Sequence, residues 1–231
     1  KLIAEDKLEE ADLRLETALS MVPDEARFHG LAADILVYQR RYEAASRRYD
    51  DAISRDPDYF DYYLGRGVAF ARQGERERAR DDLEHSVDLL PTALAMSELG
   101  ELALQSNDRV SAKEYFQAAS AASGLVGEQS RAAFMRLDIP DNPTQYVAAQ
   151  PVVNNAGRLL VRVENRSPVA MRDISIEFQA VIAGQLATRT LVVPGLAPGQ
   201  IGELDSGLNF PQGVLPTANQ VNVVVRGAGV E

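Results

Sequence analysis

Small, large and proline residues recur along the first half of the chain with a period of 34. Prolines mark this period at Pro23, Pro57 and Pro91. Before each proline, at fixed offsets, stand a small residue, a large residue and a second small residue: Ala11, Leu15 and Ala18; Ala45, Tyr49 and Ala52; Ala79, Leu83 and Ser86; a further set without a proline is Ala112, Phe116 and Ala119. Spacings of three and four residues place such side chains on one face of a helix, and proline ends a helix. The pattern therefore predicts repeated helices that bury one face.

This period resembles the tetratricopeptide repeat (TPR), a pair of antiparallel helices that stacks into a solenoid. The small residues let paired helices approach closely. The turns between the helices hold Arg40-Arg41, Gly74 and Asn107-Asp108, and glycine and asparagine supply the left-handed conformation that a helix end requires. The resemblance implies a TPR solenoid over residues 1–137, with full repeats at about 26–57, 60–91 and 93–123.

The two ends of the predicted solenoid differ from its middle. Residues 1–23 supply only the second helix of a partial repeat, and the chain begins with Lys1 rather than Met. Because a solenoid unit cannot bury its apolar face alone, we expect the chain to be a C-terminal piece of a longer protein. A processed N-terminus followed by a single capping helix is the alternative. At the other end, residues 128–137 predict a helix that caps the repeats.

The second half of the chain changes to the alternating pattern of β-strands. Residues 138–151, with two prolines near their start, read as a linker, although an early strand near 146–153 would also fit. Residues 152–231 then predict a small antiparallel β-sandwich, whose strands are expected at 158–165, 173–182, 186–193, 201–208 and 219–226. The fold class is thus a multidomain chain, first α and then β.

Two turn motifs give this β-region a resemblance to a known type of domain. Val163-Glu-Asn-Arg-Ser167 ends a strand, and Gly195-Leu-Ala-Pro-Gly199 forms a tight turn. Both are similar to turns in the immunoglobulin-like (Ig-like) accessory domains of bacterial envelope proteins. The resemblance implies an Ig-like β-sandwich and describes turn chemistry rather than a function.

Charge and composition exclude several classes of function. The net charge of −10 argues against nucleic acid as a partner, because binding to phosphates needs a basic stripe, and the arginines here are interleaved with acids. No run of residues is long and apolar enough for a membrane span. The absence of cysteine excludes disulfides and thiolate metal sites, and it leaves both the cytoplasm and the bacterial periplasm open.

No catalytic or metal-binding constellation stands out in the sequence. His29 occupies a position where a TPR helix places a bulky packing residue, and His85 has no second histidine within reach. HExxH, GxSxG and P-loop motifs are absent. We therefore expect no enzyme activity, no metal and no cofactor in this chain.

The remaining candidate site is the groove that the first helices of a TPR solenoid line. In the register of the repeats this surface comprises Arg27, Leu31, Asp34, Tyr38, Asp61, Leu64, Val68, Arg72, Leu94, Glu98, Glu101 and Gln105. Leu31, Tyr38, Leu64, Val68 and Leu94 form an apolar strip with acidic flanks, and charging Leu64 and Val68 is expected to abolish partner binding. The Lys/Asn clamp of chaperone-binding TPR proteins is missing, so an extended or helical segment with apolar side chains fits better.

Four aromatic residues at the start of the second repeat, within Tyr59–Tyr63, are either packing residues or part of a contact surface.

The order of the parts resembles one family as a whole. Asp58–Gly67, Ala79–Ser86, Leu89–Thr92 and Arg136–Pro143, followed by an Ig-like module, are similar to the C-terminal region of BepA-like TPR-containing zinc metalloproteases of the bacterial envelope. In that family an HExxH protease domain precedes the repeats. The resemblance implies that this chain is the arm that docks substrates or partners in the periplasm, and that zinc belongs to the parent protein.

The partner of such an arm would be a protein or peptide segment, or the parent's own preceding domain. Two alternatives have no enzyme attached: an envelope lipoprotein adaptor for assembly or secretion machinery, and a cytoplasmic adaptor.

Overall fold

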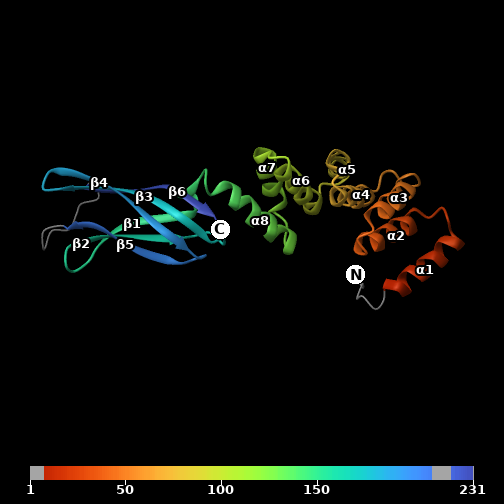
Figure 1. The fold of residues 1–231 in the computed structure, drawn as a ribbon, viewed down its shortest axis with the longest axis horizontal. Helices are drawn as coiled ribbons and strands as arrows, with labels where there is room; N and C mark the ends of the chain where they lie inside the picture. Colours follow the sequence, from red (N-terminus) through yellow and green to blue (C-terminus); the bar gives the residue numbers. More distant parts are fainter. Residues whose placement is uncertain (1–7, 210–219, 231) are drawn as a thin grey trace. The chain divides into compact units, whose positions relative to one another are not determined.

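The computed structural model describes residues 8–209 and 220–230, which form two compact units. The first unit ends at Arg131 and the second begins at Ala132. Figure 1 labels the helices and strands of both. The described part of the first unit is helical, and the second contains antiparallel sheets. Each unit has a core of its own.

The helical unit is a TPR-like solenoid. After α1 (Leu8–Met21), three helix pairs follow: α2 (Ala26–Tyr38) with α3 (Tyr42–Ile53), α4 (Phe60–Gln73) with α5 (Arg76–Leu89), and α6 (Ala93–Gln105) with α7 (Arg109–Ala119). These pairs coincide with the three predicted repeats. In Figure 1 the second helices α3 and α5 follow the outer side of the arc, and α2 and α4 follow its inner side.

The turns between the paired helices have the backbone conformation that the sequence predicts. Gly74 and Asn107 adopt positive φ values of 82° and 58°. Arg40 adopts the same conformation at φ 59°, which is uncommon for a residue with a side chain. All three pairs therefore turn through a left-handed residue.

Small residues bring the paired helices into close contact. Ala45, Ala79 and Ala112 are each 0% exposed, as the repeat register predicts. Gly67 lies against the backbone carbonyl of Ala79, and Gly100 lies against the ring of Phe116. The periodic small residues thus mark the helix crossings.

The two ends of the helical region differ in how much of them the structure describes. Helix α1 packs on α2 through Leu15, Ala32 and Ile35. The rest of the predicted partial repeat, residues 1–7, lies outside the described residues. The predicted capping helix is α8 (Leu125–Asp138), which begins three residues before its expected start at 128 and ends one residue after its expected end at 137.

The second unit contains two three-stranded antiparallel sheets. After the short helix α9 (Pro143–Tyr146), the strands are β1 (Val147–Val153), β2 (Arg158–Asn165), β3 (Met171–Ile182), β4 (Gln185–Leu196), β5 (Ile201–Asn209) and β6 (Val221–Val230). The sheet orders are β1-β2-β5 and β4-β3-β6. Residues 147–151, the last part of the predicted linker, are therefore in strand β1, where the sequence also allowed an early strand.

One hydrophobic core is shared by the two sheets. Val161 and Val163 of β2 are fully buried with Ile176 and Phe178 of β3. The alternation of buried and more exposed residues along β2 and β3 explains the period of two in the sequence.

A buried asparagine at the end of β2 joins two turns. The side-chain amide of Asn165 donates to the backbone carbonyls of Val169, Leu196 and Ala197 at 2.8–3.2 Å. Its side-chain oxygen accepts hydrogen bonds from the backbone amide and the hydroxyl of Ser167, both at 2.9 Å. The asparagine and serine of the strand-end motif thus hold the loop after β2 against the end of β4.

Replacing Ala79 with Phe tests the repeat register. We expect a loss of about 1–3 kcal/mol or more in unfolding free energy, because the fully buried crossing has no room for a ring. Ala118→Phe, at an exposed position of α7, is the control and should change stability by about 0.5 kcal/mol or less. Urea unfolding measures both, and equal effects would show that the helix crossing lies elsewhere.

Replacing Asn165 with Ala tests the buried amide. The unfolding free energy should fall by about 1–3 kcal/mol, because buried carbonyls lose their donor. Asn154→Ala is the control: the side-chain oxygen of Asn154 accepts hydrogen bonds from two backbone amides, but in an exposed turn. Calorimetry that finds the control variant as unstable as Asn165→Ala would contradict a special role for the buried amide.

Candidate functional site

The first helices of the first two repeats, together with α3, enclose a pocket, which we call the inner pocket. Its volume is about 190 Å³, and it is lined by Arg27, Gly30, Leu31, Asp34, Tyr49, Tyr59, Asp61 and Tyr62. Four of the predicted groove residues, Arg27, Leu31, Asp34 and Asp61, are thus brought together. Tyr49 and Gly30 were not predicted as groove residues.

Two glycines make the walls of the inner pocket possible. A methyl group at Gly30 would collide with the ring of Tyr62, and one at Gly65 would collide with the ring and hydroxyl of Tyr49. Both tyrosines are buried. The glycines therefore let α2, α3 and α4 approach closely enough for tyrosine rings to fill the space between them.

Tyr49 reaches one of the two carboxylates of the inner pocket. Its hydroxyl donates a 2.6 Å hydrogen bond to Oδ1 of Asp34. The carboxylate of Asp34 is accessible from solvent at the pocket, yet the surrounding protein raises its pKa above the ordinary value. The hydrogen bond from Tyr49 opposes this shift, and the nearby charge of Asp61 adds to it. Burial and the charge of Asp34 raise the pKa of Tyr49, which stays protonated as a donor.

The second carboxylate, Asp61, lies in the first turn of α4. Desolvation by the surrounding protein raises its pKa as well, although Asp61 stays accessible to solvent. Within the described part of the chain, neither Asp34 nor Asp61 has an arginine or lysine within ion-pair distance. The inner pocket therefore holds two carboxylates that no lysine or arginine among the described residues neutralises by direct contact.

The structure contradicts the prediction that the middle of the apolar strip faces solvent. Leu64 is only 5% exposed and packs with Leu83 and Leu99 in the core, and Val68 is half-buried against the same cluster. Charges at Leu64 and Val68 would therefore disturb the repeat instead of testing the groove. The face of α4 that carries Leu64 turns toward the neighbouring repeat, not toward solvent.

The other predicted groove residues remain at the surface. Leu31, Tyr38 and Leu94 are 52%, 49% and 43% exposed, and Glu101 and Gln105 are exposed too. Arg72 and Glu98, from the second and third repeats, form an ion pair at 3.2 Å.

The aromatic cluster of the second repeat is divided between the two expected roles. Tyr62 is buried, whereas Tyr59 is 42% exposed and lines the inner pocket. The rings of Tyr59 and Tyr62 meet edge to face with their centroids 4.8 Å apart.

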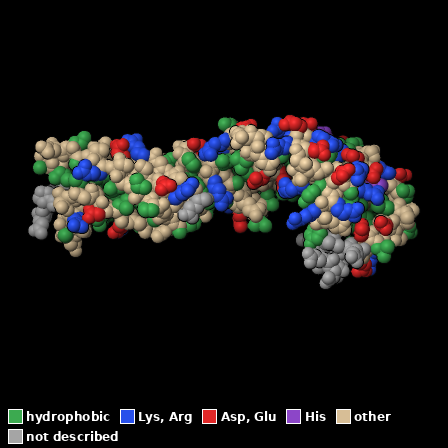
Figure 2. All heavy atoms as spheres, in the orientation of Figure 1, with side chains coloured by type: hydrophobic (Ala, Val, Ile, Leu, Met, Phe, Trp, Pro, Cys, Tyr) green, Lys and Arg blue, Asp and Glu red, His purple; other side chains and the backbone are tan. Residues whose placement is uncertain are grey.

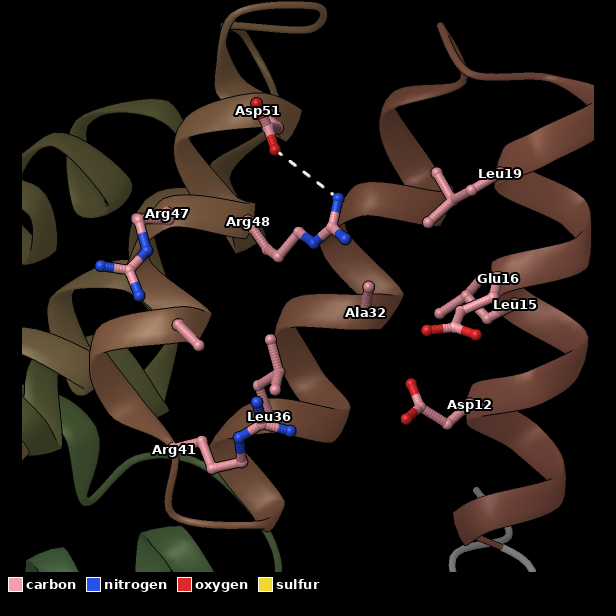
Figure 3. A pocket seen from close by; sticks show the side chains of 11 residues that line it. Asp12, Leu15, Glu16, Leu19, Ala32, Leu36, Arg41, Arg47, Arg48 and Asp51 are labelled. Atoms are coloured by element: carbon pink, nitrogen blue, oxygen red, sulfur yellow. Dashed lines mark ion pairs between the residues drawn. The ribbon is translucent and has the colours of Figure 1, made fainter.

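A second cavity of about 380 Å³ lies between α1 and α3, and we call it the α1–α3 cavity (Figure 3). Asp12 and Glu16 project into it from α1, and Arg48, which pairs with Asp51, faces them from the other side. Opposite charges thus face each other across this cavity. On the visible face of the helical unit in Figure 2, acidic and basic side chains are likewise intermingled.

The two histidines have packing contacts. His29 is buried, and its Nε2 lies 2.8 Å from the carbonyl of Pro23, which agrees with a packing position at the edge of the core. His85 packs against the ring of Tyr63. Across residues 8–209 and 220–230, no group of three or more His, Asp or Glu side chains is arranged to hold a metal ion.

Comparisons with known proteins agree with the repeat pattern. A family model described as "Tetratricopeptide repeat" matches residues 31–93. The crystal structure of MamA is similar with a TM-score of 0.52 at 14% identity, covering 58% of this chain and 78% of MamA. A thermophilic TPR protein of Thermus thermophilus is similar with a TM-score of 0.50 at 22% identity, covering 55% of this chain and 73% of that protein. The helical unit therefore has a TPR-like fold.

The comparisons do not extend to whole relatives. The match to the MamA RS-1 ArsTM double mutant, with a TM-score of 0.46 at 18% identity, covers 49% of this chain and 65% of that chain. No curated protein matches the sequence significantly.

Replacing Asp34 with Asn tests the electrostatics of the inner pocket. A raised pKa means that the folded state binds the proton more tightly than the unfolded state. This contribution to stability is present at acid pH and is lost as the pH rises through the raised pKa. Asp34→Asn should therefore raise Tm at pH 7 and lose this advantage in acid.

The control for this prediction is Asp50→Asn, which removes a carboxylate that pairs with Arg66 at 2.6 Å and should lower Tm at pH 7. Thermal unfolding followed by circular dichroism between pH 3 and pH 8 gives both curves, with ~0.5 kcal/mol as the scale of a surface substitution. A lower Tm for Asp34→Asn at pH 7 would mean that the Tyr49 hydrogen bond outweighs the cost of the charge.

Proposed function

We propose that the chain is a protein-interaction module that binds segments of other proteins along the inner surface of its helical unit. The observation that carries this proposal is the inner pocket, which is lined in part by the exposed apolar side chain of Leu31. Leu31 and Tyr38 lie on α2 with Asp34 between them, and Leu94 lies on α6. Apolar side chains that face solvent in this way are candidates for contact with another molecule.

The TPR-like fold supports this proposal because stacked helix pairs create extended concave surfaces, and TPR proteins use them to bind peptides and proteins. A partner that crosses the first helices would meet apolar side chains and carboxylates together. A segment with both apolar and basic residues fits this surface. No catalytic role is proposed for this chain.

A more specific proposal for the parent protein rests on the resemblance to BepA-like proteins. We propose that the chain is the docking arm of a larger metalloprotease of the bacterial envelope, which works in the periplasm, with zinc held by the parent and not by this chain. An Ig-like β-sandwich for the second unit fits that assignment, since its two antiparallel sheets share one core. None of the helices in the described residues has the length and apolar character of a membrane span.

The rival proposal is an adaptor with no enzyme attached, in the envelope or in the cytoplasm. Both proposals place the partner, whether another protein or a preceding domain of the parent, on the inner surface.

Site-specific photocrosslinking tests the proposed surface. A benzophenone amino acid placed at Leu31, Tyr38 or Leu94 should yield crosslinked partner protein, because these exposed side chains lie on the first helices. The matched controls are Arg47, Glu84 and Gln117, exposed positions of the second helices. Adducts that form mainly at the control positions would place the binding surface on the other side of the helical unit.

A further inference from the structure

The inner pocket has the chemistry of a site for an organic cation. Asp34 and Asp61 present carboxylates from two different helices, and no lysine or arginine in the described part of the chain pairs with either one. The net charge of −10 attracts basic partners at longer range. A cation that enters the pocket would supply the missing countercharge.

Tyrosine side chains form the remaining wall of the inner pocket. Tyr49, Tyr59 and Tyr62 line it, and the rings of Tyr59 and Tyr62 meet edge to face. The faces of aromatic rings attract lysine and arginine side chains. Their apolar surface also suits the methylene stem that carries the charged group.

A buried polar atom in this wall lacks a partner. Tyr62 is 5% exposed, and its hydroxyl has no hydrogen bond within the described residues. A buried hydroxyl without a partner is costly for a folded protein. This observation is independent of the two carboxylates, and Tyr62 lines the same pocket as they do.

Arg27 also lines the pocket, and its positive charge favours an acidic group or a carbonyl of the ligand beside it. Its guanidinium forms no ion pair with a carboxylate in the described part of the chain. A partner segment that places its cation between Asp34 and Asp61 can direct an acidic group or a backbone carbonyl toward Arg27. The pocket therefore suits a side chain on a polypeptide better than a free metal ion.

We infer that the inner pocket binds the side chain of a lysine or arginine carried by the partner segment. This inference rests on the proposed function and adds the residue type that the surface selects. The α1–α3 cavity does not compete for this role, because its arginines, Arg41, Arg47 and Arg48, balance its acids, Asp12, Glu16 and Asp51. The inner pocket, in contrast, has two carboxylates and one arginine.

Nuclear magnetic resonance titration of the whole chain tests the inference with three small probes: Nα-acetyl-lysine amide, Nα-acetyl-arginine amide and Nα-acetyl-norleucine amide. Norleucine has an apolar side chain similar to lysine's but lacks the charge. The lysine or arginine probe should shift the backbone amide signals of Gly30, Asp34 and Asp61 with saturation, and the norleucine probe should not. Equal shifts with norleucine would overturn the inference.

Two variants make the test specific. Asp61→Asn, at an exposed position, should weaken binding of the cationic probe about fivefold, the scale of one solvent-accessible ion pair. Glu16→Gln, which removes a carboxylate of the α1–α3 cavity, should leave the affinity unchanged. Unaltered affinity in Asp61→Asn, with the native spectrum retained, would contradict the inference.

The crosslinking experiment and the probe titration can fail independently of each other. If partners crosslink at Leu31 and Tyr38 but no cationic probe saturates the inner pocket, the inference fails and the proposed function stands. If the probe binds but crosslinks form only on the second helices, the cation site stands and the proposed docking surface fails.

Discussion

The inner pocket depends on how closely three helices approach one another. Gly30 and Gly65 leave room for the rings of Tyr62 and Tyr49, and a methyl group at either position would collide with the facing ring. Only because Tyr49 fills the space beside Gly65 does its hydroxyl reach the carboxylate of Asp34. The same close packing that stabilises the repeats therefore creates the chemistry of the pocket.

Much of the fold follows from local patterns in the sequence. The 34-residue period predicts the three helix pairs, because small residues at fixed spacing are needed wherever helices cross. Gly74 and Asn107 predict the turns through their preference for left-handed backbone. The strand β2 has the predicted bounds, 158–165, since alternation is strong where one face of a strand is buried.

Other features depend on contacts between residues that are far apart in the sequence. Leu64 is buried because α4 meets α5 and α6, so its exposure is set by the packing of neighbouring repeats. Tyr49 lines the pocket from α3, the second helix of its repeat, whereas the predicted groove included residues of the first helices only. Whether a strand tolerates a proline also depends on its place in the sheet: Pro151 in β1 and Pro194 in β4 both lie in edge strands, where a missing amide hydrogen is tolerated.

The inferred cation site arises from the packing of helices that brings Asp34 and Asp61 together with the tyrosines beside them. The most direct measurement is a crystal structure of the chain soaked with Nα-acetyl-arginine amide. If this site binds a cation, guanidinium density should lie in the inner pocket, within hydrogen-bonding distance of both carboxylates. An empty inner pocket at saturating concentration, or density only beside Asp12 and Glu16 in the α1–α3 cavity, would contradict it.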